Sequence, residues 1–255
     1  MTPLVSLRGV GKRFDNGVFA LRFLDLDVLP GETLTLLGPS GCGKSTALRL
    51  IAGLAQPTRG RIVWSSEEAR RGLGVVFQEA TLLPWADVFG NVYLPLRLAG
   101  VSRRDAELPV LEALALVGLE KSLDARPREL SGGMKMRCAI ARALVTRPKL
   151  LLMDEPFAAL DEVTRFGLND ELIELKRRIG ATIVFVTHSV SESVYLSTRI
   201  VVLAAGGGGV VDEIAVTPTA PRDAEFRLAG EFSTYVRRAS TALRRAMDET
   251  EGSDG

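Results

Sequence analysis

The segment TLTLLGPSGCGKSTALRLIAG, residues 33–53, decides how the rest of the chain is interpreted. Its first residues, TLTLLG, are typical of a short buried strand, and KSTALRLIAGL, which begins at Lys44, predicts a helix that ends at Gly53. A glycine-rich turn joins them and matches the pattern G-x-x-x-x-G-K-[ST]. Strand, turn and helix in this order predict a phosphate-binding loop.

The glycines of such a loop let successive backbone N–H groups turn toward phosphate oxygens, beside the positive end of the helix dipole. Lys44 is expected to reach the β- and γ-phosphates, and Ser45 is expected to coordinate Mg²⁺. The residues predicted to bind the phosphates are Gly38, Pro39, Ser40, Gly41, Cys42, Gly43, Lys44, Ser45 and Thr46. The predicted ligand is a nucleoside triphosphate with its magnesium ion.

The composition excludes several other classes of protein. The 32 basic and 31 acidic residues give a net charge of +1, which provides no strong field for a nucleic-acid backbone or an anionic bilayer. The two cysteines lie far apart and have no metal-binding spacing, as expected in a reducing compartment. The sequence has no secretory h-region and no apolar stretch of about 18 residues, so we expect neither secretion nor a membrane span.

Outward from the loop, the chain alternates between short strands and helices. Apolar and polar residues alternate near the N-terminus and predict an antiparallel β layer, whereas residues 88–144 are predominantly helical. Further short strands are predicted in GRIVW (60–64), LGVVFQ (73–78), LLLMDEP (150–156), TIVFVT (182–187) and RIVVLAA (199–205). Strand, helix and strand in succession predict parallel pairing, and therefore an α/β core with functional residues at the carboxyl ends of its strands.

The run LLLMDEP supplies a second element of a phosphate site. Asp154 ends an apolar strand, where its carboxylate can hold the Mg²⁺ shell, and Glu155 can act on a water that attacks the γ-phosphate. The alternative is that both acids are solvated loop residues. The phosphate loop favours the catalytic interpretation.

Residues 130–134, LSGGM, resemble the LSGGQ signature of the ATP-binding cassette (ABC) ATPases. The family's other motifs occur in its order over residues 4–215, namely the phosphate loop, Gln78 in VVFQ, LLLMDEP, Asp161 in FAALD, and His188. The resemblance implies a P-loop NTPase of ABC type, with an antiparallel β subdomain and an inserted α-helical subdomain at about 88–144. A helical extension over 216–247 and a disordered acidic tail over 248–255 are expected to follow.

The resemblance also implies roles for individual residues. ATP would lie between the phosphate loop of one subunit and the signature residues Ser131, Gly132 and Gly133 of a second copy, with Asp161 among the nucleotide contacts. His188, the single histidine, would bind the γ-phosphate and help to hold the attacking water; the alternative is a hydrogen-bonded structural histidine. Gln78 would sense the Mg²⁺ or the water.

Phe14 and Met134 are two further positions expected near the nucleotide. Adenine is held mainly by stacking on an aromatic ring, and Phe14 stands at the family's position for it, with Phe19 as competitor and a core role for Phe14 as the alternative. Met134 replaces the usual glutamine of the signature. We expect this change to reduce affinity or rate without inactivating the protein.

The segment LLPW, residues 82–85, resembles the nitrate, sulfonate and taurine branch of bacterial importer ATPases. Leu82, Leu83, Trp85 and Phe89 would form an apolar groove for a helix of the membrane subunit, unless they are core residues of the helical insertion. The implied partners are a second copy of the chain, permease subunits near Trp85 and, indirectly, a periplasmic or extracellular solute-binding protein, at the cytoplasmic face of the cell membrane.

Other ABC ATPases remain as alternatives. One is the ATPase of an importer or lipid-transport system for a different cargo. Another is a non-transport ABC ATPase that acts on nucleic acid. A single cassette and a near-neutral net charge disfavour the latter.

Overall fold

The computed structural model describes residues 1–219 and 221–248 of the chain. They form two compact units. The terminal unit comprises Met1–Arg70 and the described residues from Thr182 onward, and the central unit comprises the residues 71–181. The predicted acidic tail, apart from Asp248, lies outside the described residues.

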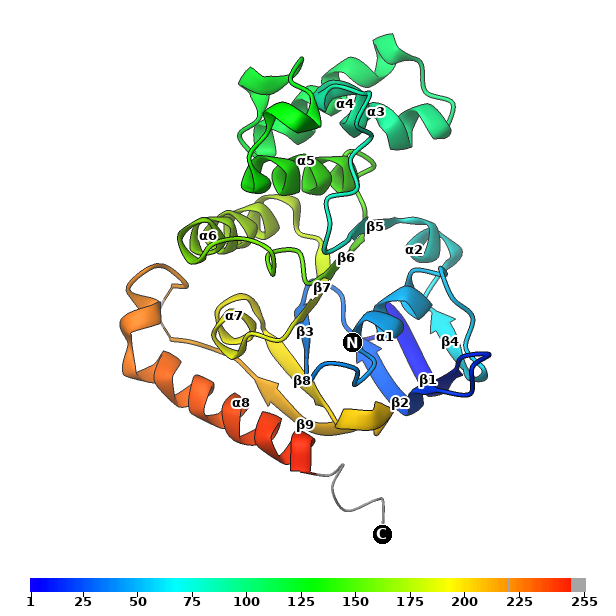
Figure 1. Ribbon diagram of the computed structural model, residues 1–255, viewed down its shortest axis with the longest axis vertical. Coiled ribbons are helices and arrows are strands. Elements are labelled where there is room, and N and C mark those ends of the chain that lie inside the picture. The colour runs from blue at the N-terminus through cyan, green and yellow to red at the C-terminus, as the bar shows by residue number, and fades with distance from the viewer. Residues whose placement is uncertain (220, 249–255) are drawn as a thin grey trace. The chain divides into compact units, whose positions relative to one another are not determined.

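The N-terminal strands of the terminal unit form an antiparallel sheet in the order β2-β1-β4 (Figure 1). These strands are β1 (Val5–Arg13), β2 (Phe19–Val28) and β4 (Arg59–Trp64). In β2, Leu24, Leu26 and Val28 are buried at alternating positions, as in a half-buried β layer. In β1 the buried residues Val5 and Leu7 are followed, after a shift in the pairing register, by Val10.

The second sheet of the terminal unit contains the strand that precedes the phosphate loop. Here β3 (Thr33–Leu37) lies between β7 (Thr182–Thr187) and β8 (Arg199–Leu203) and is parallel to both (Figure 1). All residues of β3 and β7 are buried, which explains why the two strands contain apolar residues and threonine and no charged residue. A further strand, β9 (Val210–Ala215), pairs antiparallel with β8.

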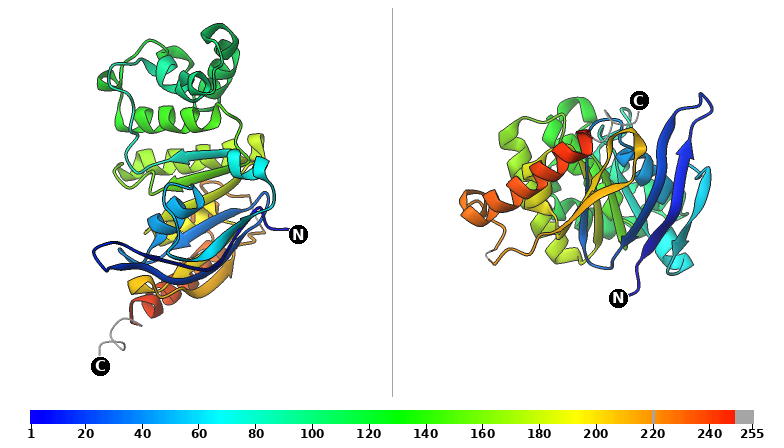
Figure 2. Two further views of the ribbon diagram at one scale, coloured as in Figure 1. Left: turned by 90° about the vertical axis from the view of Figure 1, so that its right-hand side faces the viewer. Right: turned by 90° about the horizontal axis from the view of Figure 1, so that it is seen from below.

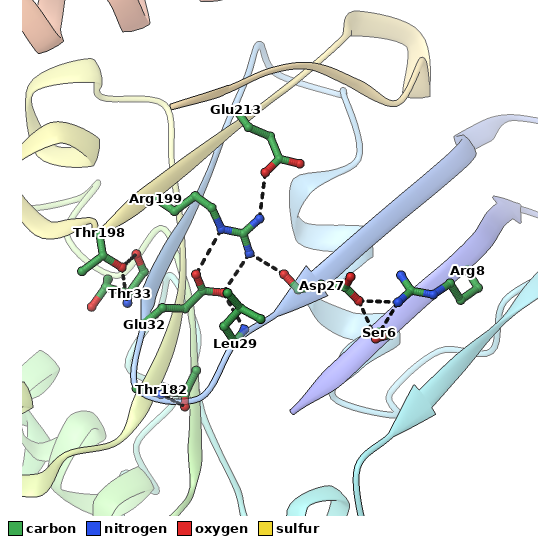
Figure 3. Close-up of polar contacts among 11 residues, drawn as sticks. Ser6, Arg8, Asp27, Leu29, Glu32, Thr33, Thr182, Thr198, Arg199 and Glu213 are labelled. Atoms are coloured by element: carbon green, nitrogen blue, oxygen red, sulfur yellow. Dashed lines mark hydrogen bonds and ion pairs between the residues drawn. The ribbon is translucent and has the colours of Figure 1, made fainter. Parts of the chain in front are cut away.

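A bidentate ion pair joins the start of β3 to β8. The Arg199 guanidinium lies 3.0 and 2.8 Å from the two carboxylate oxygens of Glu32, and 2.9 Å from Glu213 on β9 (Figure 3). The Glu32 side chain also accepts a 2.7 Å hydrogen bond from the Leu29 N–H. Because both charges are paired and hydrogen-bonded, their burial is tolerated, and the pair fixes where β3 begins.

Helices cover the strands of the terminal unit. These are α1 (Lys44–Ile51), α7 (Val190–Leu196) and α8 (Gly230–Asp248), with the short helices α2 (Glu67–Arg71), η3 (Ala205–Gly207) and η4 (Phe226–Leu228). Figure 2 shows α8 running alongside β8 and β9, which it contacts. Its buried residues are Phe232 and the alanines Ala239, Ala242 and Ala246, so the helix backbone can lie close to the strands. No helix in the described ranges is long and apolar enough to cross a membrane.

The central unit pairs β5 (Leu73–Val76) with β6 (Leu150–Asp154) in parallel. Its helices are α3 (Val88–Leu98), α4 (Arg103–Leu116), α5 (Gly132–Leu144) and α6 (Glu162–Ile179), with η1 (Glu120–Ser122) and η2 (Pro127–Glu129) between α4 and α5. Side chains cap four of these helices, as the sequence pattern of Ser and Asp before a helix leads one to expect. The predicted α/β fold, with an antiparallel sheet and an α-helical part, is confirmed.

Candidate functional site

Two glycines of the phosphate loop have backbone conformations that favour glycine over other residues. Gly41 and Gly43 have φ of +78° and +99°, in the left-handed region. A Cβ at Gly43 would lie 2.4 Å from the Ala20 carbonyl oxygen. The loop therefore packs directly on β2, and α1 begins at Lys44 with no side-chain cap on its N-terminus.

The Lys44 ammonium lies inside this loop. The side chain is buried, with 5 % of its surface exposed, and Nζ donates to the carbonyl oxygens of Gly38 at 2.8 Å and Pro39 at 2.9 Å. Nζ also lies 3.8 Å from the Cys42 sulfur. Carbonyl oxygens and a thiol carry no net charge, so the buried ammonium attracts an anion to this loop. The geometry of the loop fits a phosphate chain.

Cys42 lies in the same loop, and its thiol is buried. Burial raises the pKa of the Cys42 thiol, although the Lys44 charge acts in the opposite direction. Cys138, on α5, is also buried, and burial raises its pKa to about 12. A raised pKa leaves less of the reactive thiolate at neutral pH, so both thiols are expected to be inert in the folded chain.

At pH 7.5, we expect iodoacetamide to label Cys42 in the folded chain at least about ten-fold more slowly than in the urea-unfolded chain. The reason is that labelling requires local opening of the structure and a thiolate. MgATP should slow it further by covering the loop. Mass spectrometry of the labelled peptide measures the rate, and Cys42→Ser reports the contribution of Cys138. Equal rates in the folded and unfolded chains would contradict the burial of Cys42.

The ends of β3 and β7 bring His188 to the same sheet edge as the phosphate loop. Leu37, the last residue of β3, pairs with Thr187, the last residue of β7, so Gly38 and His188 leave neighbouring strands at the same level. His188 is exposed, and the backbone beside it is fixed, because Thr187 accepts a 3.0 Å hydrogen bond from the Ser189 N–H. The structure thus brings the start of the phosphate loop and His188 to the ends of adjacent strands, and the role of His188 remains a prediction.

Both candidate adenine-stacking residues stand at a turn of the antiparallel sheet. Phe14 is 44 % exposed and Phe19 is 43 % exposed, so neither is a core residue. The Phe19 ring contacts the guanidinium groups of Arg13 and Arg22, with centroid distances of 5.2 and 5.1 Å, whereas the Phe14 ring contacts the Lys12 ammonium, at 5.7 Å. Fewer cations therefore cover the Phe14 ring than the Phe19 ring, and this favours Phe14 as the residue that stacks on adenine.

Within the central unit, the ends of β5 and β6 carry the other predicted catalytic residues. Val76 pairs with Met153, so Gln78 follows β5 at the edge where Asp154 ends β6. Asp154 is 6 % exposed, and Glu155 directly after it has φ of +45°. A non-glycine residue in the left-handed region is uncommon, and such strain is concentrated at functional sites.

The signature residues and Asp161 lie together in the central unit. Ser131 caps α5 by accepting a 3.2 Å hydrogen bond from the Met134 N–H, and Gly132 and Gly133 form the first turn. Asp161 caps α6 by accepting from the Thr164 N–H at 3.0 Å, and this hydrogen bond holds the pKa of its carboxyl below the usual range. The two helix starts are adjacent, because a Cβ at Gly133 would lie 2.9 Å from the Thr164 side chain.

A cleft of about 440 Å³ opens beside the segment that follows Gln78. Leu83 and Trp85 line it, together with Tyr93, Leu94, Arg97 and Arg126, and Trp85 is 73 % exposed. Phe89 is 8 % exposed and does not line this cleft, so it is a core residue, and Leu82 does not line the cleft either. Of the four residues predicted to form the groove, Leu83 and Trp85 line this cleft, and their role in docking remains a prediction.

Two residues that shape this region were not singled out from the sequence. Asn91 is fully buried, and its amide accepts from the Leu83 N–H at 2.7 Å and donates to the carbonyl oxygens of Leu83, Ala86 and Asp87. Arg142 donates to the backbone of Ala80 and Thr81. An asparagine within an otherwise apolar helical pattern was the available signal for Asn91, whereas Arg142 had none.

The family model described as "ABC transporter" matches residues 21–158. An uncharacterized ABC transporter ATP-binding protein of Methanocaldococcus jannaschii, MJ0412, is 44% identical over 232 residues, which are 90% of this chain and 86% of that protein. The nitrate transport protein NasD of Klebsiella oxytoca is 43% identical over 84% of this chain and 85% of its own length. The spermidine/putrescine import ATP-binding protein PotA of Frankia alni is 42% identical over 95% of this chain and 53% of its own length.

Among solved structures, the chain is similar to the ATP-binding cassette MJ0796, determined as a dimer in a post-hydrolysis state bound to ADP and Pi. The TM-score is 0.74 with 33% sequence identity, and the match covers 84% of this chain and 99% of that one. The phosphate loop lies within the matched part of the family model.

Proposed function

This chain belongs to the ABC transporter family, whose ATP-binding subunits hydrolyse ATP to power transport, and we propose that it energises a bacterial importer. The observation that carries the proposal is the phosphate loop, with the buried Lys44 ammonium at its centre. The proposed location is the cytoplasmic face of the cell membrane, where ATP is available and a permease can be reached.

We propose that Lys44 binds the β- and γ-phosphates, and that Ser45, Gln78 and Asp154 hold the magnesium ion. Hydroxyl, amide and carboxylate oxygens are the donors that Mg²⁺ prefers, and much of its shell comes from phosphate and water. The Asp154 carboxylate, buried at the end of β6, fits such a ligand set. When bound, the ion neutralises charge on the phosphates.

The chain's own residues account for the remaining chemistry. Glu155 accepts a proton from the attacking water, and His188 holds that water and the γ-phosphate by hydrogen bonds. Ser131, Gly132 and Gly133 of a second copy supply N–H and hydroxyl donors at a helix N-terminus. The dimeric state of the similar cassette MJ0796 supports a dimer that completes the site.

For the cargo we propose nitrate, a sulfonate or a taurine-like solute. The LLPW segment and the 43% identity to NasD, a nitrate transport protein, support this class. The similar identity of 42% to PotA, named for spermidine and putrescine import, makes polyamines the second candidate. Uptake of labelled nitrate, taurine and spermidine by cells with and without this subunit separates the two, and loss of spermidine uptake alone would contradict our choice.

We further propose that the cleft beside Trp85 receives a short helix of the permease. Its apolar wall is formed by Leu83, Trp85 and Leu94, and Trp85 is the exposed aromatic residue that such an interface needs as an anchor. A solute-binding protein would act through the permease and would not contact this chain.

Trp85→Ala should weaken binding of the co-expressed permease by about 30-fold, the effect of losing an aromatic anchor worth about 2 kcal/mol. ATP binding by the isolated chain should be unchanged. Quantitative copurification from detergent measures the effect. Leu108→Ala is the matched control, because Leu108 is 66 % exposed on α4 and lies outside the cleft. Equal losses in both variants would contradict docking at Trp85.

A further inference from the structure

One guanidinium holds the backbone that follows Gln78. Arg142 on α5 donates to the Ala80 carbonyl at 2.8 Å, to the Thr81 carbonyl at 2.9 Å and to the Thr81 hydroxyl at 3.1 Å. All three acceptors belong to two consecutive residues. The planar fork of arginine suits this arrangement, and charge-assisted hydrogen bonds of this kind are stronger than neutral ones.

Thr81 has an unfavourable backbone conformation at this point. Its φ is +45°, in the left-handed region. A β-branched residue is a true outlier there, because its side chain crowds the backbone. Such a conformation persists only where surrounding contacts impose it. Three hydrogen bonds from Arg142 act on this residue and its neighbour.

The location of this contact connects three features of the central unit. Thr81 lies between Gln78, the proposed sensor of the ATP site, and Trp85 in the proposed docking cleft. Arg142 lies in the last turn of α5, the helix that begins with the signature glycines. The same side chain therefore joins the signature helix to the segment that runs from Gln78 to the cleft.

We propose that Arg142 is a positioning residue that latches residues 80–81 to α5 and keeps Thr81 in its left-handed conformation. The segment then has two states, a latched state and a released state in which Thr81 relaxes to negative φ. In the latched state α5, Gln78 and the cleft move together. A change in the bound nucleotide is therefore transmitted to the permease. This inference rests on the proposed function for the roles of Gln78 and Trp85.

The latch predicts a specific pattern of rescue. Arg142→Met removes all three donors, and Thr81 should then leave its strained conformation. Glycine adopts the left-handed conformation without cost, so adding Thr81→Gly should restore the latched backbone without the guanidinium. If Arg142 served only to pack α5, a glycine in this loop would increase disorder and would restore nothing.

Trp85 reports the conformation of the segment in the full chain. The chain has two tryptophans, so Trp64→Phe leaves Trp85 as the single fluorophore. In this background we expect Arg142→Met to lower the Trp85 anisotropy and to abolish its response to MgATP, and we expect Arg142→Met with Thr81→Gly to recover both. Arg147→Met is the control, because Arg147 follows α5 but pairs with Glu112 at 2.8 Å.

ATP hydrolysis gives a second measurement. Arg142→Met should lower kcat about ten-fold, with KM for ATP within about two-fold, and the double variant should recover most of kcat, as expected for residues coupled in one network. Arg142→Lys, which retains the charge and loses the fork, replaces Arg142→Met if circular dichroism shows that the latter is unfolded.

The latch is overturned if the Arg142→Met and Thr81→Gly effects simply add, or if Arg147→Met changes Trp85 equally. Different results would contradict the proposed function and the Arg142 latch. A parent chain that binds a fluorescent ATP analogue and never hydrolyses ATP contradicts the proposed function, whereas the nucleotide-free anisotropy still tests the latch.

Discussion

Glu155→Gln should lower the ATP turnover of the chain by about a hundred-fold or more, because a positioned general base contributes about 10²- to 10⁴-fold to the rate. The amide has the size of the carboxylate but cannot accept the proton of the attacking water. ATP binding should remain, since the phosphate loop is unchanged. Phosphate release measures turnover, and equilibrium binding of a fluorescent ATP analogue measures affinity.

The same variant should accumulate as an ATP-bound dimer, since nucleotide that is not hydrolysed keeps the two copies together. Size-exclusion chromatography with light scattering detects it. Glu162→Gln is the matched control, because Glu162 is an exposed carboxylate in the first turn of α6. Glutamine retains the backbone preferences of glutamate at φ of +45°, so the fold should be preserved. Turnover equal to that of the parent would exclude Glu155 as the base.

Lys44→Met should have the second large effect, and it should act on binding as well as on turnover. Removing a charged hydrogen-bond donor costs about 1.5–3 kcal/mol, which corresponds to roughly 10- to 150-fold in ATP affinity. Turnover should fall further, by about 10²- to 10³-fold, because the ammonium also stabilises charge that develops in the transition state.

Methionine keeps the length and apolar stem of lysine, so the buried position of Lys44 remains filled. The Gly38 and Pro39 carbonyls, which accept from Nζ in the parent, lose this donor. Lys121→Met, at an exposed lysine in η1, controls for loss of a positive charge elsewhere. ATP affinity within two-fold of the parent, measured by the same fluorescent analogue, would contradict the proposed role of Lys44.

The elements that the sequence predicted well are those specified by local pattern. β3 and β7 are buried throughout, so their apolar runs could be recognised without knowledge of their neighbours. The phosphate loop follows from the glycines that its backbone requires, at Gly41 and Gly43. The α/β fold predicted from these features is confirmed, whereas the catalytic roles of the individual residues remain predictions.

Features that depend on distant contacts were not predictable. Arg142 reaches Ala80 and Thr81 across about 60 positions of the sequence, and no periodic pattern signals a hydrogen bond from a side chain to such a backbone. The burial of Phe89 was equally open, since a phenylalanine on an amphipathic helix suits both a core and a docking surface. A docking surface can be identified only when it is known which apolar side chains are exposed in the folded chain.

The division of the chain into units has a consequence for synthesis on the ribosome. The central unit is continuous in sequence, whereas β3 pairs with strands that begin at Thr182 and Arg199, some 150 residues later. Because translation proceeds from the N-terminus, the central unit can collapse on emergence while the nucleotide loop still lacks both neighbours of its supporting strand. We therefore expect ATP-binding competence to be acquired late, after the chain up to Leu203, the end of β8, has left the exit tunnel.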